Sequence, residues 1–435
     1  MPSVALYTLG CKVAQYETEA LAEQFIKEGF ELRSFEESAD AYLINTCTVT
    51  AESDRKSRQI IRRAKKRNPA AVVAVVGCYS QLAPNEIQKL GVEVVLGTQD
   101  KLLAPKLVKE RLKDGSLPDF CSVSDLSHAD FERMSIKSAP RTRAYVKIED
   151  GCESKCTYCA IKLARGRVRS KAREDVIREV GELYGGGVRE IVLTGIETGA
   201  YGRDFDTGYT LGDLIRELDS LGMPDRIRLG SLAPELVGKD FAEKIRGTKI
   251  LAPHFHISMQ SGSDKVLNLM KRRYNSEMAY ENIARLREIF PNAQFTTDMM
   301  VGFHGESEED FLLSLDFIKK VGFLDVHVFS YSKRKGTEAY SFENQVPEEI
   351  KRERSRRMIS FKNAIRDEQL SLIVKSGREL PVIAETELDC GIYSAHADNF
   401  AEIRFAVKDK RDVKGELVTV RPVSSKCGII YAEEI

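Results

Sequence analysis

Three cysteines within eight residues, Cys152, Cys156 and Cys159, are the side chains in this sequence that point most directly to chemistry. A cubane iron–sulfur cluster has four irons, and each iron normally binds one cysteine thiolate. Three thiolates this close together can hold three irons of one cluster and leave the fourth iron open. An open iron can bind a small molecule and pass it an electron, so the spacing predicts a reactive iron–sulfur cluster.

Zinc and disulfide bonds are the alternatives for these cysteines. A structural zinc site needs four N or S ligands, commonly from two separated pairs, and no Cys or His follows Cys159 until His254. A disulfide framework requires an oxidising compartment, and the sequence begins without the basic and apolar regions of a secretion signal. We therefore expect a cytoplasmic protein whose thiols bind metal.

Charge is balanced over the 435 residues but unevenly distributed. The 66 basic and 66 acidic residues cancel, which excludes a general attraction to nucleic acid. Eight of the thirteen residues from 55 to 67, and six of the twelve from 162 to 173, are nevertheless Lys or Arg. These segments either contact RNA or are solvated faces. Apolar stretches such as residues 71–76 are too short to span a bilayer, so we expect no membrane partner.

The N-terminal part of the chain predicts an α/β domain with a mostly parallel sheet. Short apolar runs at residues 4–10, 41–46, 71–77 and 92–97 alternate with helical patterns. Cys11, Cys47 and Cys78 directly follow the first three runs. Ligands collect at the carboxyl ends of the strands in an open parallel sheet. These three thiols should therefore converge on one edge of the sheet and hold a second cluster.

The middle and the end of the chain predict two further domains. Strand candidates at residues 145–148, 191–193, 226–229, 254–259, 294–300 and 326–331 alternate with helices and predict a partial barrel, with its chemistry at the carboxyl ends of the strands. A charged helix at 352–370 precedes short Val- and Ile-rich runs typical of a small β-barrel, which either binds RNA or acts as a cap. We place the N-terminal domain at 1–118, a linker at 119–143, the barrel at 144–368 and the C-terminal domain at 369–435.

Several motifs resemble those of the radical S-adenosylmethionine (SAM) methylthiotransferase family. The Cys-x-x-x-Cys-x-x-Cys spacing is the radical SAM signature. The segments Thr8–Glu17, Asn45–Thr50 and Gly77–Tyr79 resemble the family's N-terminal domain, although Ala14 stands where the family usually has Asn. The later segments that match are Gly151–Ser170, Gln260–Ser263 and Asp298–Glu306. The resemblance covers nearly the whole chain and implies an open (β/α)6 barrel followed by a TRAM-like domain.

This resemblance implies two [4Fe–4S] clusters and SAM as cofactors. The cluster of Cys152, Cys156 and Cys159 would cleave SAM to a 5′-deoxyadenosyl radical, and the auxiliary cluster of Cys11, Cys47 and Cys78 would present the sulfur. The residues implied to contact SAM are Tyr158, Thr194, Gly195, Glu197, Ser231, Gln260, Asp298, Val301 and Gly302. The four histidines at 254, 256, 304 and 327 are interpreted as satisfied barrel residues, and we assign no metal to them.

The basic segments supply the residues expected to contact RNA. They are Arg62, Arg63, Lys66 and Arg67 in the first segment, and Arg165, Arg167 and Arg169 in the second. Arginine suits phosphate and carboxylate because its planar fork binds such anions through two hydrogen bonds. The second group could equally reach the SAM carboxylate.

Within the family, the segments Lys56–Gln59 and Leu193–Gly202 resemble one class of tRNA-modifying enzymes. That class adds a methylthio group to C2 of N(6)-threonylcarbamoyladenosine at position 37, next to the anticodon. The implied partners are the tRNA anticodon stem-loop, an external electron donor and a sulfur donor. The alternatives are an isopentenyladenosine methylthiotransferase, a methylthiotransferase for a ribosomal-protein aspartate, and a non-catalytic iron–sulfur protein that binds RNA.

Overall fold

The computed structural model describes residues 1–139, 142–409 and 411–435 and divides them into two compact units. Residues 140 and 141 of the predicted linker and residue 410 of the predicted C-terminal domain lie outside the described residues. The first unit contains Met1–Ile136, Lys147–Lys171 and Ser332–Tyr340, and the second contains Lys137–Val146, Ala172–Tyr331 and Ser341–Ile435. The predicted boundaries differ from this division, because the segment with Cys152, Cys156 and Cys159 packs with the N-terminal sheet.

The first unit is built on a six-stranded parallel sheet with the strand order β2-β1-β3-β4-β5-β6. Its strands are β1 (Ser3–Thr8), β2 (Glu31–Arg33), β3 (Ala41–Thr46), β4 (Val72–Gly77), β5 (Val94–Leu96) and β6 (Phe120–Ser122). The four strands expected from apolar runs are confirmed. The sequence analysis missed β2 and β6 because both are three-residue strands at the sheet edges, and β6 falls within the predicted linker.

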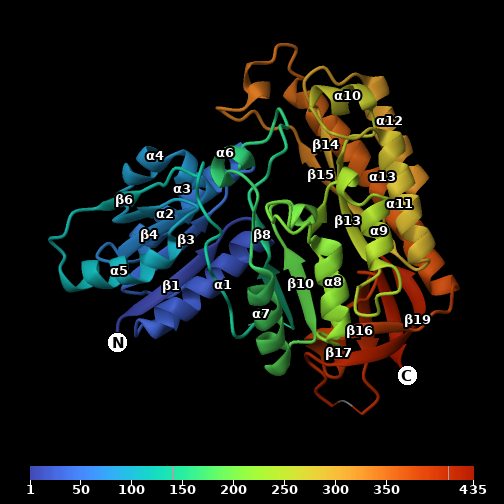
Figure 1. The fold of residues 1–435 in the computed structure, drawn as a ribbon, viewed down its shortest axis with the longest axis horizontal. Coiled ribbons are helices and arrows are strands. Elements are labelled where there is room, and N and C mark those ends of the chain that lie inside the picture. The colour runs from blue at the N-terminus through green and yellow to red at the C-terminus, as the bar shows by residue number, and fades with distance from the viewer. Residues whose placement is uncertain (140–141, 410) are drawn as a thin grey trace. The chain divides into compact units, whose positions relative to one another are not determined.

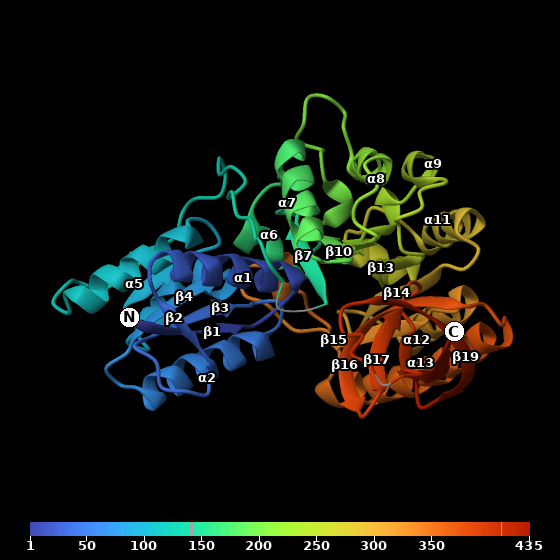
Figure 2. The ribbon, with the colours of Figure 1, turned by 90° about the horizontal axis from the view of Figure 1, so that it is seen from below.

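Helices cover both faces of this sheet. Figure 2 shows α1 (Lys12–Lys27) and α5 (Ala104–Lys113) on one face and α2 (Ala51–Arg67) on the other. Two short helices, α3 (Cys78–Leu82) and α4 (Pro84–Gln88), follow β4. The first unit also contains a two-stranded antiparallel ribbon, β8 (Glu149–Asp150) with β9 (Arg169–Ser170), and helix α6 (Ile161–Arg165) between its strands.

The second unit contains the partial barrel, in which all six expected strands are present. They are β7 (Arg143–Lys147), β10 (Glu190–Thr194), β11 (Arg226–Leu229), β13 (His254–Gln260), β14 (Gln294–Val301) and β15 (Asp325–Ser330). The ladder is interrupted after β11, which gives a three-stranded sheet, β11-β10-β7, and a four-stranded sheet that begins with the short strand β12 (Ser231–Leu232). The connecting helices include α7 (Arg173–Gly185), α8 (Leu211–Ser220), α9 (Lys239–Ile245), α10 (Asp264–Leu269), α11 (Ser276–Ile289) and α12 (Glu308–Val321), and most are labelled in Figure 1.

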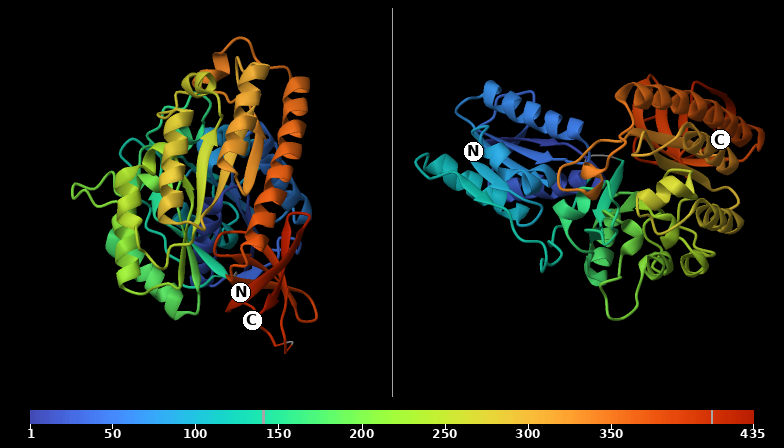
Figure 3. Two further views of the ribbon diagram at one scale, coloured as in Figure 1. Left: turned by 90° about the vertical axis from the view of Figure 1, so that its right-hand side faces the viewer. Right: turned by 90° about the horizontal axis from the view of Figure 1, so that it is seen from above.

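The same unit ends in a closed five-stranded barrel. Figure 3 shows the long helix α13 (Glu348–Lys375), in orange, leading into the red strands. The barrel strands are β16 (Leu380–Asp389), β17 (Ile392–Ala397), β18 (Glu402–Ala406), β19 (Leu417–Lys426) and β20 (Ile429–Glu434). The predicted β-barrel is confirmed. Strand β17, Ile-Tyr-Ser-Ala-His-Ala, is not one of the Val- and Ile-rich runs on which the prediction was based.

A buried ion cluster connects this β-barrel to the partial barrel. Glu190 of β10 accepts hydrogen bonds from Arg226 and Arg228 at 3.0–3.2 Å. Arg228 also donates to the carbonyls of Ala397 and Asp398 at the end of β17. Because all these groups are buried, they fix the two barrels against each other within the second unit. None of the helices in the described residues has the length and apolar composition needed to cross a bilayer.

Candidate metal centres

The first cysteine triad lies at the carboxyl ends of three neighbouring strands. Cys11 precedes α1, Cys47 follows β3, and Cys78 is the first residue of α3 after β4. The three thiols are close enough to interact electrostatically. Gly10 has φ of 121°, and a side chain there would place its Cβ 3.0 Å from the Cβ of Cys47. A glycine is thus required where the chain approaches Cys47.

The protonation of these thiols is dominated by burial. Burial raises the pKa of Cys78 to about 12 and also raises the pKa of Cys47. A coordinated metal removes the thiol proton outright, so bound iron would replace protons at these sulfurs. Soft thiolates are the ligands that iron–sulfur clusters use, and the set of three fits a cubane with one open iron. The role of Cys11, Cys47 and Cys78 as ligands remains a prediction.

The second triad lies in the loop between β8 and α6. The backbone N–H of Cys159 donates to the carbonyl of Cys156 at 3.1 Å, and Ser154 N–H donates to the Sγ of Cys152 at 3.4 Å. The Cys152 N–H donates to the carbonyl of Gly166, beyond α6, which closes the loop. Burial raises the pKa of Cys159 to about 11, and the other two thiols of the triad interact with it. A compact set of three sulfurs again fits a cubane with one open iron.

A network of buried charges surrounds both triads, and the sequence analysis missed it. The Arg165 guanidinium, fully buried, donates to Glu17 at 2.6 and 3.1 Å and to Asp150 at 3.1 Å. Lys147 donates to the same two carboxylates at 3.0 and 3.2 Å. Burial acts to raise the pKa of Glu17, but the charges of Arg165 and the neighbouring lysines hold it well below its usual value. The carboxylates are therefore ionised in the interior.

The structure separates the three arginines that were expected to reach RNA or the SAM carboxylate. Arg165 and Arg169 are buried, and Asp150 lies 3.1 Å and 3.8 Å from their guanidinium groups. Their burial does not fit a contact with RNA phosphates. Arg167 is exposed, and its RNA contact remains a prediction. The sequence held no signal for this difference, because the three arginines alternate along one basic segment.

The residues expected to contact SAM divide between the two units. Tyr158 belongs to the first unit. In the second, Thr194 ends β10 and Gly195 follows it, Ser231 begins β12, and Gln260 ends β13. Val301 ends β14, and Gly302 follows it with φ of 72°. These positions lie at strand ends, as expected, and their contact with SAM remains a prediction.

Asp298 differs from the other candidates because it lies inside β14. Its carboxylate is 3.2 Å from Nε2 of His256 and 3.3 Å from Nδ1 of His327. Despite burial, these two partners lower the pKa of Asp298, and the Asp298 carboxylate raises the pKa of His327. The ligand-capable atoms of the three residues lie within 4.8 Å of one another. Hydrogen bonding between the carboxylate and both rings accounts for the pairing of His256 and His327 with Asp298, and the interpretation of the histidines as barrel residues without a metal remains a prediction.

Glu197 follows β10 and has a raised pKa. The Ala233 N–H donates to its carboxylate at 3.2 Å. Burial raises the pKa of Glu197 to about 7, opposed by the charge of Arg272 and reinforced by that of Glu235. An acid that titrates near neutrality beside a strand end is typical of a functional site.

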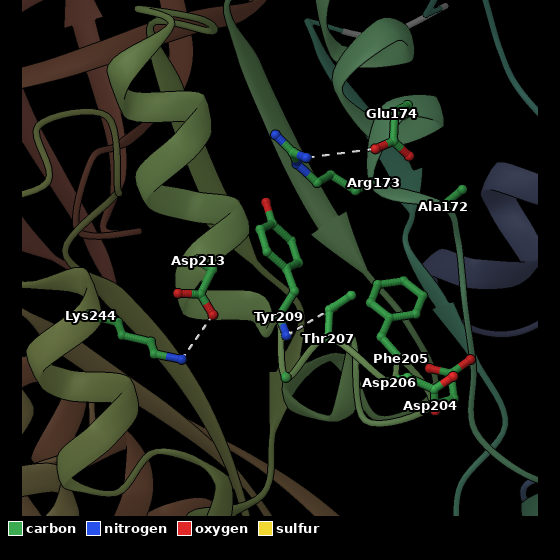
Figure 4. A pocket seen from close by; sticks show the side chains of 11 residues that line it. Ala172, Arg173, Glu174, Asp204, Phe205, Asp206, Thr207, Tyr209, Asp213 and Lys244 are labelled. Carbon is green, nitrogen blue, oxygen red and sulfur yellow. Dashed lines mark hydrogen bonds and ion pairs between the residues drawn. The ribbon is translucent and has the colours of Figure 1, made fainter.

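A surface pocket of about 710 Å³ lies elsewhere in the second unit, beside the starts of α7 and α8. Figure 4 shows Arg173, Tyr209, Asp213 and Lys244 on its walls. The two cations on these walls are already paired, because Lys244 donates to Asp213 at 2.8 Å and Arg173 pairs with Glu217. None of the residues expected to bind a cofactor or RNA lines this pocket.

Comparisons with known proteins identify the family. The Radical SAM superfamily matches residues 146–318, and the uncharacterized protein family UPF0004 matches residues 3–97. The threonylcarbamoyladenosine tRNA methylthiotransferase MtaB of Bacillus subtilis is 39% identical over 100% of this chain and 96% of its own. The chain belongs to the radical SAM methylthiotransferase family. Family membership confirms an enzyme of this kind, with SAM and [4Fe–4S] clusters as its cofactors.

Other relatives agree with this membership. MtaB of Thermotoga maritima is 36% identical over 93% of this chain and 92% of its own. The tRNA-2-methylthio-N(6)-dimethylallyladenosine synthase of Acetivibrio thermocellus is 33% identical over 83% of this chain and 77% of its own. Among solved structures, the radical SAM methyltransferase TsrM of Kitasatospora setae matches with a TM-score of 0.54 at 17% identity. It covers 76% of this chain and 73% of TsrM, and it shows the fold alone.

Replacing one triad by alanine should remove one cluster and leave the other. The triple change Cys152→Ala, Cys156→Ala and Cys159→Ala should reduce the iron content of the reconstituted methylthiotransferase from about eight to about four per chain. Each triad supplies its own sulfur ligands, so the clusters should assemble independently. Iron analysis and electron paramagnetic resonance would measure this. Retention of both clusters would contradict the partition, and the change Cys121→Ala, outside both triads, is the control.

The Glu197→Gln variant should alter how stability depends on pH. The folded protein holds the Glu197 proton more tightly than the unfolded chain does, because its pKa rises from the usual 4.5 to about 7. Its contribution to stability is therefore fully present below pH 4.5 and is lost as the pH rises through 7. Glu197→Gln should unfold at a higher temperature than wild type at pH 8 but not at pH 4.5. If the unfolding temperatures of wild type and Glu197→Gln changed with pH in the same way, the raised pKa of Glu197 would be refuted. The control is Glu182→Gln, at an exposed position of α7.

Proposed function

We propose that this methylthiotransferase adds a methylthio group to C2 of N(6)-threonylcarbamoyladenosine at position 37 of tRNA. One observation carries the choice of nucleoside. Four relatives named for threonylcarbamoyladenosine are 32–39% identical to this chain, and those of Bacillus subtilis, Thermotoga maritima and Aquifex aeolicus are 36–39% identical. Relatives named for dimethylallyladenosine are 29–33% identical. The isopentenyladenosine enzyme is therefore the second candidate.

The two cysteine triads of this chain would hold two clusters with different roles. The bound clusters and SAM supply the radical chemistry and the sulfur. Cys11, Cys47 and Cys78 would hold the auxiliary cluster, and Cys152, Cys156 and Cys159 would hold the cluster that cleaves SAM. Both triads belong to the first unit, which supports a reaction that uses them together. The target base must leave its stack to reach the reacting atoms.

The exposed part of α2 is the surface that best supports an RNA contact. Arg62 and Lys66 are exposed, and neither forms an ion pair with any residue that the structure describes. Arg63 and Arg67, in contrast, both pair with Glu36. Arg62 and Lys66 would therefore attract phosphates most strongly among the four residues expected to do so. Arg167 and the C-terminal barrel, which we infer to be a TRAM-like domain, would add further contacts.

The reaction also needs partners that supply what the chain lacks. An external electron donor must reduce the cluster that cleaves SAM, and a sulfur donor must renew the sulfur that is transferred. The proposed substrate is the anticodon stem-loop of tRNA, and we infer that the enzyme works in the cytoplasm.

Analysis of tRNA nucleosides tests the proposed substrate. Wild-type enzyme with SAM and a reductant should convert N(6)-threonylcarbamoyladenosine in tRNA to its 2-methylthio form, as measured by mass spectrometry. The triple change Cys11→Ala, Cys47→Ala and Cys78→Ala should abolish this product but still release 5′-deoxyadenosine, because the other cluster remains. Modification of isopentenyladenosine alone would favour the second candidate. Normal product from the variant would refute the role of the auxiliary cluster.

Charge substitutions on α2 test the RNA surface. Replacing Arg62 and Lys66 by Gln should weaken tRNA binding and reduce its dependence on salt, because each phosphate contact releases condensed counterions. The matched double change at Arg63 and Arg67 should have a smaller effect, because Glu36 already offsets their charge. Filter binding between 50 and 200 mM salt would measure both slopes, as these values span the range in which such contacts weaken strongly (roughly 10³-fold for six contacts). Equal slopes for all three proteins would exclude this helix from the interface.

A further inference from the structure

A buried cationic side chain directly contacts a sulfur of the auxiliary triad. The Nε–H of Arg165 donates a hydrogen bond to the Sγ of Cys78 at 3.1 Å. Both residues are buried, with Arg165 at 0% and Cys78 at 6% exposure. The charge of Arg165 also acts on Cys47, where it lowers the thiol pKa against the larger effect of burial. Arg165 is thus the cation that the described residues place against the buried side of this triad.

The other edge of the same guanidinium fixes its orientation. Its two terminal nitrogens bind Glu17, and Nη1 also contacts Asp150, so Nε–H is left to face Cys78. A planar guanidinium held through two hydrogen bonds to a carboxylate has little rotational freedom. The contact with Cys78 is therefore directed by the surrounding network.

We propose that Arg165 is a positioning residue that raises the reduction potential of the auxiliary cluster through its hydrogen bond to Cys78. Hydrogen bonds to cluster sulfurs and the net charge around a cluster set its potential. Reduction adds negative charge to the iron–sulfur core, and a donor and a cation at the Cys78 sulfur stabilise that charge. The proposal concerns the cluster alone and does not depend on which nucleoside is modified.

Arg165 also connects the two triads along the chain. It ends α6 and lies six residues after Cys159, the last cysteine of the radical triad. Helix α6 packs against α3, which begins with Cys78, and Thr98 donates to the carbonyl of Ala164 at 2.7 Å. The segment that would hold one cluster therefore supplies the hydrogen bond to a ligand of the other.

The test isolates the auxiliary cluster in the full-length chain. In the background Cys152→Ala, Cys156→Ala and Cys159→Ala, only the auxiliary cluster should remain, and its midpoint potential can be measured by an anaerobic titration followed by electron paramagnetic resonance. Adding Arg165→Met should lower the potential, because the hydrogen bond and the charge are both lost. Adding Arg165→Lys keeps the charge without the directed Nε–H and should give an intermediate potential. Arg167→Met, at the exposed neighbour, should leave the potential unchanged.

A purely structural role for Arg165 makes a different prediction. It would lower iron content or thermal stability in the Arg165 variants but leave the potential of the remaining cluster at the background value. That value for both variants would overturn the proposal. If Arg165→Met does not fold, Arg165→Lys decides the question, because it keeps a cation beside Glu17 and Asp150. An unchanged potential in that variant overturns the proposal, and a lowered one supports it.

Discussion

The buried contact of the Arg165 guanidinium with the Glu17 and Asp150 carboxylates is the interaction on which the cluster-bearing unit depends. Glu17 lies on α1, Asp150 on β8 and Arg165 at the end of α6, so one side chain ties α1 to two segments that lie far along the chain from it. Removing one member of a buried ion pair typically costs about 3–5 kcal/mol, because the remaining charge loses its partner. Here Arg165 shares both carboxylates with Lys147. The relative placement of α1, β8 and α6 within the unit is therefore strongly specified.

The parallel sheet supplies the second constraint. Cys11, Cys47 and Cys78 are more than 30 residues apart, but the adjacent strands β1, β3 and β4 all end at the same edge. The second triad uses the opposite strategy, because its cysteines lie in one short loop closed by the β8–β9 ribbon. Gly151 has φ of 89°, and a Cβ there would come within 1.8 Å of the Arg167 carbonyl. Long-range topology builds one site, and local backbone geometry builds the other.

Apolar runs and residue spacing predicted the strands and cysteine sites that depend on local sequence pattern. The β3 run at 41–46 matches the observed strand because it is short, mostly apolar and followed by a turn. The β11 run at 226–229, Arg-Ile-Arg-Leu, matches because Ile and Leu alternate with the two arginines. The cysteines were visible because their residue type and spacing are rare. Strands β2 and β6 were missed, since their pairing partners and not their composition make them strands. The assignment of the 147–171 segment to the N-terminal unit was also missed, because tertiary contacts alone decide it.

The basic segment at 162–173 shows why charge in a sequence does not locate charge on a surface. Its arginines read as a solvated or RNA-binding turn, but Arg165 and Arg169 face the interior and Arg167 faces solvent. Burying these arginines requires carboxylates, and one of them, Glu17, lies 148 residues before Arg165 in the sequence. Arg165 and Arg169 are thus held in the interior and are not available to RNA. Arg167, unlike Arg165 and Arg169, therefore remains available for a contact at the surface.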